Sequence, residues 1–241
     1  YEYMGPAWYQ REIEIPAAWK GKRIFLYFER THWLSSVYVG KEEVSKIDYI
    51  SIPHNHELTQ WLHPGKKELI TFCIDNRYQY DTHKWDHAHS EFTQINWNGV
   101  LGEIKLVAVD PVYVDDMQVY PDIKNKSIKV KMTVRNCTEH TASGKISFHV
   151  TGKDYRLQKE VPVTVTDSIT YIEEEMFLGK DIHLWNEFHP NLYTLDCKLT
   201  SSVEGQSYAH EKSTTFGMRE VEAGEDHIIL NGEPIHLRGT V

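Results

Sequence analysis

The sequence lacks the features that would direct it to a membrane or to nucleic acid. Its 241 residues contain no apolar run approaching the roughly 20 residues of a membrane-spanning helix. The formal net charge is −9, which disfavours contact with nucleic acid or an anionic membrane surface. The first residues, Tyr1-Glu-Tyr-Met, have neither the basic start nor the apolar centre of a signal peptide, and the compartment stays open. We therefore expect no membrane and no nucleic acid among the partners.

Cysteine is scarce as well. The three cysteines, Cys73, Cys137 and Cys197, form no C-x-x-C pair. Cys73 and Cys197 lie in strand-like runs, which favours buried thiols. A disulfide between Cys137 and Cys197, joining two strands of the second half, is the alternative. We expect no cofactor.

Helical periodicity is nearly absent from the first half of the chain. Only Leu58, Trp61 and Leu62 recur at helical spacing, enough for one turn before Pro64-Gly65. Elsewhere, short apolar or alternating runs are separated by proline and glycine turns, which indicates a β-sandwich or jelly roll over residues 1–111. The strands predicted there are 8–16, 23–29, 33–39, 68–74 and 103–109.

A second β domain is predicted for residues 112–217. Residues 127–134 alternate cleanly, with apolar side chains at the even positions and lysine or threonine between them. Seven strands in about a hundred residues is the count of an immunoglobulin-like sandwich. The predicted strands are 114–119, 127–134, 145–150, 160–165, 170–177, 192–199 and 208–216.

The last residues, 218–241, predict a hairpin and a new strand. Asn231-Gly232 separates the apolar runs 228–230 and 235–237, and Asn-Gly supplies the positive φ angles of a type I′ turn. Residues 237–241 then read as a strand whose backbone groups need a further sheet. We expect this polypeptide to be the front part of something longer.

Four motifs carry a family resemblance: Ala7-Trp-Tyr-x-Arg-x-Ile-x-Ile-Pro16, Leu58-x-x-Trp-Leu-x-Pro-Gly65, Leu184-Trp-Asn-x-x-x-Pro-Asn-Leu-Tyr193, and Phe216-Gly-Met-Arg-Glu followed by 230–239. Together they resemble glycoside hydrolase family 2, which contains β-galactosidases, β-glucuronidases and β-mannosidases. The resemblance implies an all-β chain: a jelly-roll, galactose-binding-like domain at 1–111 with a truncated first strand, an immunoglobulin-like sandwich at 112–217, and at 218–241 the start of an absent catalytic TIM barrel. One departure is the turn Val39-Gly-Lys-Glu, where the family usually has Val-Asn-Gly.

The resemblance also implies a role. Retaining glycosidases use two carboxyl groups roughly 5 Å apart, and in this family both are glutamates on later barrel strands. The chain is therefore expected to be a non-catalytic part of such an enzyme, inactive alone, with no catalytic residue of its own. Its implied partners are the missing barrel and, through the full-length protein, a carbohydrate substrate; a homo-oligomer is compatible with the resemblance. A periplasmic or secreted location fits the family better than a cytoplasmic one.

The candidate site is a patternless stretch from Arg77 to Asn98. A loop of this length in a compact domain is usually functional or disordered, and its many aromatic residues argue against disorder. Aromatic rings stack on the C–H faces of sugars, while Asp, Asn and His bind hydroxyl groups. The stretch therefore predicts a lining for a sugar pocket, and an ordered surface loop is the plain alternative. The aromatic residues are Tyr78, Tyr80, Trp85, Phe92 and Trp97.

The strongest substrate-binding candidates in this stretch are Asn96 and Trp97, beside a glycine-rich turn. Trp85 and Asp86 are the next candidates. Plain packing is the alternative for Trp97. The resemblance adds Arg238, which in the family lies near the nucleophile carboxylate; a structural ion pair under the barrel floor is its alternative.

A metal site is the sharper alternative for the same stretch, because imidazoles with a carboxylate suit zinc. The spacing fits no compact zinc pattern, so no metal is predicted. The residues concerned are His83, Asp86, His87, His89 and Glu91.

Two rival functions remain. A stand-alone carbohydrate-binding module with an immunoglobulin-like spacer would bind sugar by itself. An adhesion or scaffold protein would have no use for the strand that starts at Leu237-Arg-Gly239.

Overall fold

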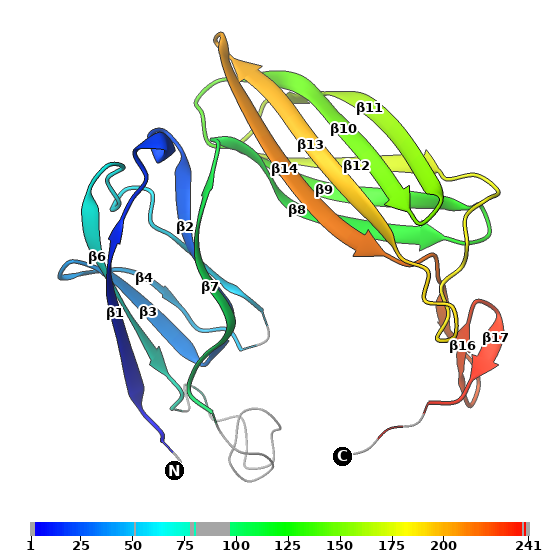
Figure 1. The fold of residues 1–241 in the computed structure, drawn as a ribbon, viewed down its shortest axis with the longest axis horizontal. Helices are drawn as coiled ribbons and strands as arrows, with labels where there is room; N and C mark the ends of the chain where they lie inside the picture. Colours follow the sequence, from blue (N-terminus) through cyan, green and yellow to red (C-terminus); the bar gives the residue numbers. More distant parts are fainter. Residues whose placement is uncertain (1–2, 51, 78–79, 81–96, 238, 240–241) are drawn as a thin grey trace. The chain divides into compact units, whose positions relative to one another are not determined.

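The computed structural model describes residues 3–50, 52–77, 80, 97–237 and 239, in two compact units, Tyr1–Val109 and Asp110–Val241. Within that part of the chain the only helix is a short 3₁₀ turn, η1 (Ala17–Trp19), and everything else regular is strand, as Figure 1 shows. The all-β prediction is confirmed. No described helix has the length and apolar character that crossing a bilayer requires.

The first unit is a sandwich of two antiparallel sheets, with strand orders β1-β6-β3-β4 and β5-β2-β7. Its core holds Ile24, Phe28, Val37, Leu58 and Ile74, each almost fully buried. The strands are β1 (Pro6–Glu14), β2 (Arg23–His32), β3 (Leu34–Val39), β4 (Glu42–Ile47), β5 (His54–Glu57), β6 (Lys67–Asp75) and β7 (Gly99–Val109).

Two of these strands, β4 and β5, were not predicted. The strand β4 carries mostly polar side chains and packs at a sheet edge, and it follows β3 through the two-residue loop Gly40-Lys41, where Gly40 has a φ of 60°. The strand β5 reads His-Asn-His-Glu, which has no apolar signal at all. The predicted helical turn is present as one hydrogen bond from the Leu62 amide to the Leu58 carbonyl, 3.1 Å long.

Buried histidines explain β5. His54 and His56 are fully buried and belong to a histidine cluster with three hydroxyl groups, those of Thr31, Ser35 and Ser45. The Ser35 hydroxyl lies 2.6 Å from His54 Nδ1 and 2.8 Å from His56 Nε2, and His56 Nδ1 lies 2.7 Å from the Ser45 hydroxyl. Since β2 and β5 belong to one sheet and β3 and β4 to the other, the cluster joins the two sheets.

The second unit is a sandwich of β11-β10-β13-β14 on β12-β9-β8. All seven predicted strands form, each longer than predicted, and Ile128, Val130, Met132 and Val134 of β9 face the core. The strands are β8 (Val112–Asp122), β9 (Ser127–Asn136), β10 (Ala142–Gly152), β11 (Tyr155–Val165), β12 (Ile169–Phe177), β13 (Tyr193–Val203) and β14 (Gln206–Phe216).

Two of the three cysteines are buried, as their strand-like sequence surroundings predicted. Cys73 and Cys197 are buried thiols, and burial raises the pKa of Cys197 to about 12. Cys137 is exposed, and the structure forms no disulfide between it and Cys197. The predicted alternative of a disulfide was wrong, because the Cys197 side chain points from β13 into the core of the second unit.

A small sheet, β15-β16-β17, ends the described chain: β15 (Val221–Ala223), β16 (Ile228–Leu230) and β17 (Glu233–Ile235). The Asn231-Gly232 hairpin is confirmed, with φ angles of 53° and 87° at the two turn residues. The return strand was predicted two residues too late, because a two-residue loop pairs Leu230 directly with Glu233. Leu237 and Gly239 lie in no strand.

Two of the sequence motifs meet at Trp185. The Arg219 guanidinium lies over the Trp185 ring, 4.6 Å from its centre. The Trp185 carbonyl accepts a 2.9 Å hydrogen bond from the side chain of Asn231. A Cβ on Gly217 would lie only 2.9 Å from the Trp185 side chain, so glycine is required for this approach. The hairpin is therefore fastened to the segment before β13.

Acidification should weaken the first unit through the histidine cluster. Burial lowers the pKa of His56 to about 3 and also lowers that of His54. The unfolded chain then binds more protons below about pH 6.5, so this stability is complete above that pH. It falls by about 1.4 kcal/mol per pH unit for His56 as pH drops toward 3, and His54 adds a loss of the same sign. Urea unfolding between pH 7 and 5, followed by tryptophan fluorescence, measures this slope.

The variant His56→Gln should show a flatter pH slope than the unaltered chain. His63→Gln is the comparison variant, because the His63 side chain is largely exposed and lies beside Glu68, and it should not flatten the slope. An unaltered slope in His56→Gln would contradict the assignment.

Close packing of β10 on β13 makes a second prediction. A Cβ on Gly144 would lie 1.9 Å from the carbonyl oxygen of Thr200, and backbone cannot move aside cheaply. Gly144→Ala should lower the unfolding free energy of the second unit by about 1–3 kcal/mol. The control Ser143→Ala, at an exposed neighbour, should be near neutral when both are compared by circular dichroism. Equal stability of the two variants would refute this account.

Candidate functional site

The described residues that flank the 77–98 stretch converge at one end of the first unit. The stretch leaves the end of β6 at Asp75 and returns at Trp97, two residues before β7. Sequence reasoning treated Asp75-Asn76 only as the cap of a strand. The structure makes this pair the centre of a hydrogen-bonded junction.

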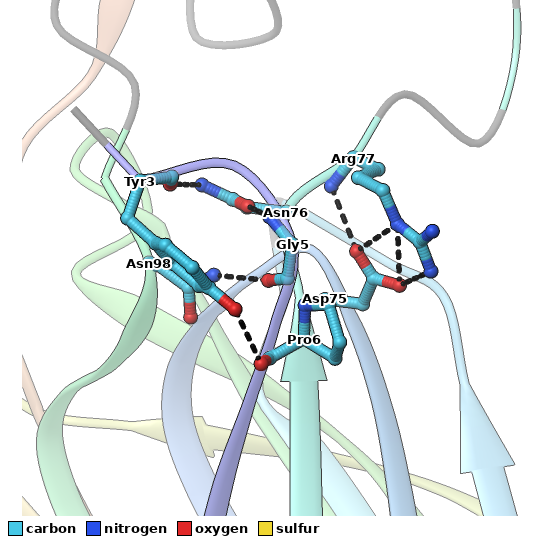
Figure 2. Close-up of polar contacts among 7 residues, drawn as sticks. All are labelled: Tyr3, Gly5, Pro6, Asp75, Asn76, Arg77 and Asn98. Atoms are coloured by element: carbon cyan, nitrogen blue, oxygen red, sulfur yellow. Dashed lines mark hydrogen bonds and ion pairs between the residues drawn. The ribbon is translucent and has the colours of Figure 1, made fainter.

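Asn76 is the central residue of the junction and is 1% exposed. Its side-chain oxygen accepts a 2.9 Å hydrogen bond from the Gly5 amide. Its side-chain nitrogen donates to the carbonyl of Tyr3 at 2.9 Å and to that of Trp97 at 3.1 Å. Asn98 adds a 2.7 Å bond to the Gly5 carbonyl, and the Tyr3 hydroxyl donates to the Pro6 carbonyl. Figure 2 shows all of these contacts except the one to Trp97.

Asp75 and Arg77 form an ion pair beside Asn76. The Arg77 Nε atom lies 3.0 Å from each carboxylate oxygen, and the Arg77 amide donates to Oδ1 at 3.0 Å (Figure 2). Hydrogen bonds from Arg77 hold the pKa of Asp75 below its usual value, although burial acts in the opposite direction. The carboxylate therefore stays charged and orients the first residue of the stretch.

His32 receives the returning end of the stretch. Its Nδ1 lies 2.8 Å from the Trp97 carbonyl, so Nδ1 carries the proton and donates. The two rings are 5.0 Å apart and tilted by 35°. His32 Nε2 and Asn98 Oδ1 are buried and have no hydrogen-bond partner within the described ranges. Both are acceptors in this arrangement, and they are the sort of atom that a water or a hydroxyl group satisfies.

Of the predicted substrate-binding residues, the structure places only Trp97; of the other aromatic residues in the stretch it places only Tyr80, which is exposed and donates to Asp48. Trp97 is half-buried and packs on His32, while its backbone joins the Asn76 junction. Trp85, Asp86, Asn96 and Arg238 lie outside the described residues, as do all five residues weighed as metal ligands. Elsewhere in the described chain, no three His, Cys, Asp or Glu side chains gather as metal ligands would.

Sequence reasoning missed His32, Asn76 and Asn98. His32 falls between two predicted strands, and an Asn after a strand usually marks a turn. Their roles depend on contacts between residues up to 93 positions apart in the sequence. Such contacts leave no local signal.

The junction predicts a measurable effect of Asn76→Ala. The substitution removes three hydrogen bonds and leaves buried backbone groups unpaired, which should cost about 1–3 kcal/mol in the stability of the first unit. Amide hydrogen exchange at Gly5 should quicken markedly. Asn98→Ala, which loses one bond to the same residue, should give a smaller effect, and unchanged exchange at Gly5 in Asn76→Ala would contradict the junction.

Comparisons with known proteins agree on one family. Residues 112–219 match the family described as "Glycosyl hydrolases family 2". A β-galactosidase of Thermoanaerobacter pseudethanolicus is 24% identical in an alignment 241 residues long that covers 99% of this chain and 32% of that protein. A β-glucuronidase of Sus scrofa is 22% identical over 267 residues, covering 98% of this chain and 39% of the relative.

Solved structures show the same fold. The Bacteroides uniformis β-glucuronidase superposes with a TM-score of 0.79 at 18% identity, over 98% of this chain and 29% of that one. The Dictyoglomus thermophilum β-D-glucuronidase has a TM-score of 0.70 at 22% identity, over 99% and 41%. The chain spans 22% to 40% of the length of the curated relatives it matches. By the match of residues 112–219 and by the relatives that align along nearly its whole length, this chain is similar to glycosyl hydrolases family 2.

Proposed function

We propose that this chain is a non-catalytic, N-terminal part of a retaining β-glycoside hydrolase. In that role it holds the domain geometry of the enzyme and supplies the 77–98 stretch to the substrate pocket. The observation that carries the proposal is the alignment of 98–99% of the chain with a minor part of enzymes named β-galactosidase and β-glucuronidase. On this view the carboxyl pair that cleaves the glycosidic bond is contributed by a barrel that follows Val241.

The junction at Asn76 supports the role of the stretch. A loop that contacts a substrate must be held by rigid elements, because small displacements of a binding group weaken catalysis steeply. Here both flanks of the stretch are tied to a buried side chain and to the N-terminal segment at Tyr3 and Gly5. His32 Nε2 and Asn98 Oδ1, which have no partner among the residues that the structure describes, lie where the stretch returns to β7.

The described carboxylates of this region support a non-catalytic role. A retaining pair needs two carboxyl groups roughly 5 Å apart, one of them poised to give up a proton. Asp75 is locked to Arg77 with a lowered pKa, which suits a fixed anchor rather than a general acid. The junction positions residues and leaves the chemistry to other parts of the enzyme.

The test is hydrolysis by a longer polypeptide. The chain extended by its downstream coding sequence should cleave a p-nitrophenyl β-galactoside or β-glucuronide, and proton NMR should show the product formed first with its β configuration retained. The chain of 241 residues alone should release no nitrophenol. Hydrolysis by the short chain, or an extended polypeptide without glycosidase activity on either substrate, would refute the proposal.

A further inference from the structure

The two sheets of the second unit differ in the composition of their outer faces. The sheet β11-β10-β13-β14, all of whose strands the structure describes, carries no exposed aromatic or large aliphatic side chain. The sheet β12-β9-β8 carries three exposed aromatic side chains: Tyr171 at 78%, Phe177 at 65% and Tyr120 at 47%. Exposed aromatic residues gathered on one face are typical of protein interfaces. The outer face of β12-β9-β8 therefore has the composition of an interface.

Alternation along the strands fixes which side chains form this face. Val130 and Met132 of β9 and Met176 of β12 lie in the core, so the residues between them point away from it. Along β12 the outward residues are large, acidic, acidic and large, and opposite them on β9 they are small, basic, basic and small. They are Tyr171, Glu173, Glu175 and Phe177 on β12, paired in that order with Thr133, Lys131, Lys129 and Ser127 on β9.

Contacts within the chain hold the charged side chains in place. Lys131 Nζ lies 3.1 Å from Glu173 Oε1 and also lies over the Tyr120 ring, 5.5 Å from its centre. The Ser127 hydroxyl donates a 3.2 Å hydrogen bond to Glu175. The side chains of Lys131 and Glu173 are nevertheless 47% and 57% exposed. Since an ammonium group has three donors and a carboxylate has about four acceptor sites, each can bind a second partner.

A second copy of this face is complementary to the first. If a twofold axis runs parallel to the strands, between β9 and β12, then β12 of each copy lies over β9 of the other. The register then puts Tyr171 over Thr133 of the second copy. At the other end Phe177 lies over Ser127, and between these ends both glutamates lie over lysines. Large residues thus meet small ones, and acidic residues meet basic ones.

The charges also select this orientation over the alternative. A twofold axis perpendicular to the strands would place glutamates over glutamates and lysines over lysines, which electrostatic repulsion disfavours. The parallel axis keeps the strands of the two copies aligned, as in the common packing of one sheet face on another.

We propose that the outer face of β12-β9-β8 is a dimer interface, and that its partner is the same face of a second copy of this chain. The aromatic residues at the two ends of β12 cover the small residues of β9, and the charged residues between them set the register. The inference does not rest on the proposed function, because it uses only residues of the second unit.

The size of the face predicts a weak dimer. The three strands are 9 to 11 residues long, so the face measures roughly 15 by 30 Å, or about 450 Å² on each copy. A total near 900 Å² is at the low end of specific interfaces, and we expect a dissociation constant of roughly 10 to 100 μM. Because charge pairs contribute, the dissociation constant should rise with salt concentration.

Sedimentation equilibrium of the 241-residue chain measures this association. We expect a monomer–dimer equilibrium with the salt dependence given above. A chain that stays monomeric up to about 1 mM, tenfold above the weakest expected dissociation constant, would overturn the proposal and leave the face to another domain of a longer polypeptide.

Two charge-reversal variants identify the surface that meets in the dimer. Lys129→Glu with Lys131→Glu makes the face acidic, and Glu173→Lys with Glu175→Lys makes it basic. Each variant alone should dimerise at least about tenfold more weakly, and an equimolar mixture should form a heterodimer, because the two faces then have opposite charge. A dimer that neither variant weakens, or folded variants whose mixture stays monomeric, would overturn the proposal.

A milder substitution decides the matter if the charge-reversal variants fail to fold. Tyr171→Ser changes an exposed side chain and should weaken the dimer by about fivefold or more. Lys198→Glu is the control, because it breaks the exposed Lys198–Glu211 pair on the other sheet, and it should leave the dissociation constant unchanged. Equal dissociation constants for the Tyr171→Ser and Lys198→Glu variants would contradict the assignment of this face.

Discussion

The buried side chain of Asn76 is the constraint on which this account depends. Its amide satisfies one donor and two acceptors of the backbone, in the segments at Gly5, Tyr3 and Trp97. An unpaired backbone group buried there would cost as much as a lost hydrogen bond, so the three segments can only meet around a side chain with this donor and acceptor set. The two described ends of the 77–98 stretch are held in place as a consequence.

Alternation and turn chemistry predicted most of the fold. The strand β9 has a clean period of two, and Asn231-Gly232 specified its hairpin with both residues at positive φ. The misses have physical reasons. Hydrophobicity cannot reveal β5, because its inward positions are histidines whose nitrogens are satisfied by hydroxyl groups from β2, β3 and β4. Those hydroxyls come from residues that look like ordinary polar strand positions until the two sheets are packed.

The candidate site was predictable only in part. The aromatic content of the 77–98 stretch singled out Trp97, whose carbonyl lies 2.8 Å from His32 Nδ1, and its role in binding a substrate stays a prediction. The anchoring residues were invisible, because Asn76, Asn98 and His32 act through backbone groups distant in sequence. The motifs behaved differently: those around Trp185 and Phe216 were noticed as separate signatures, and the structure shows that they contact each other through Arg219 and Gly217. Two motifs that are far apart in the sequence can thus form the two sides of one contact.

The central claim is that the junction at Asn76 positions a stretch of this chain for the glycosidase proposed above. The most direct measurement is kcat/KM of that proposed full-length enzyme, with and without Asn76→Ala, at a temperature where circular dichroism shows both to be folded. The account predicts a clear fall in kcat/KM for the variant, carried mainly by a raised KM if the stretch binds the substrate equally in its ground and transition states. An unchanged kcat/KM in a folded variant would contradict it.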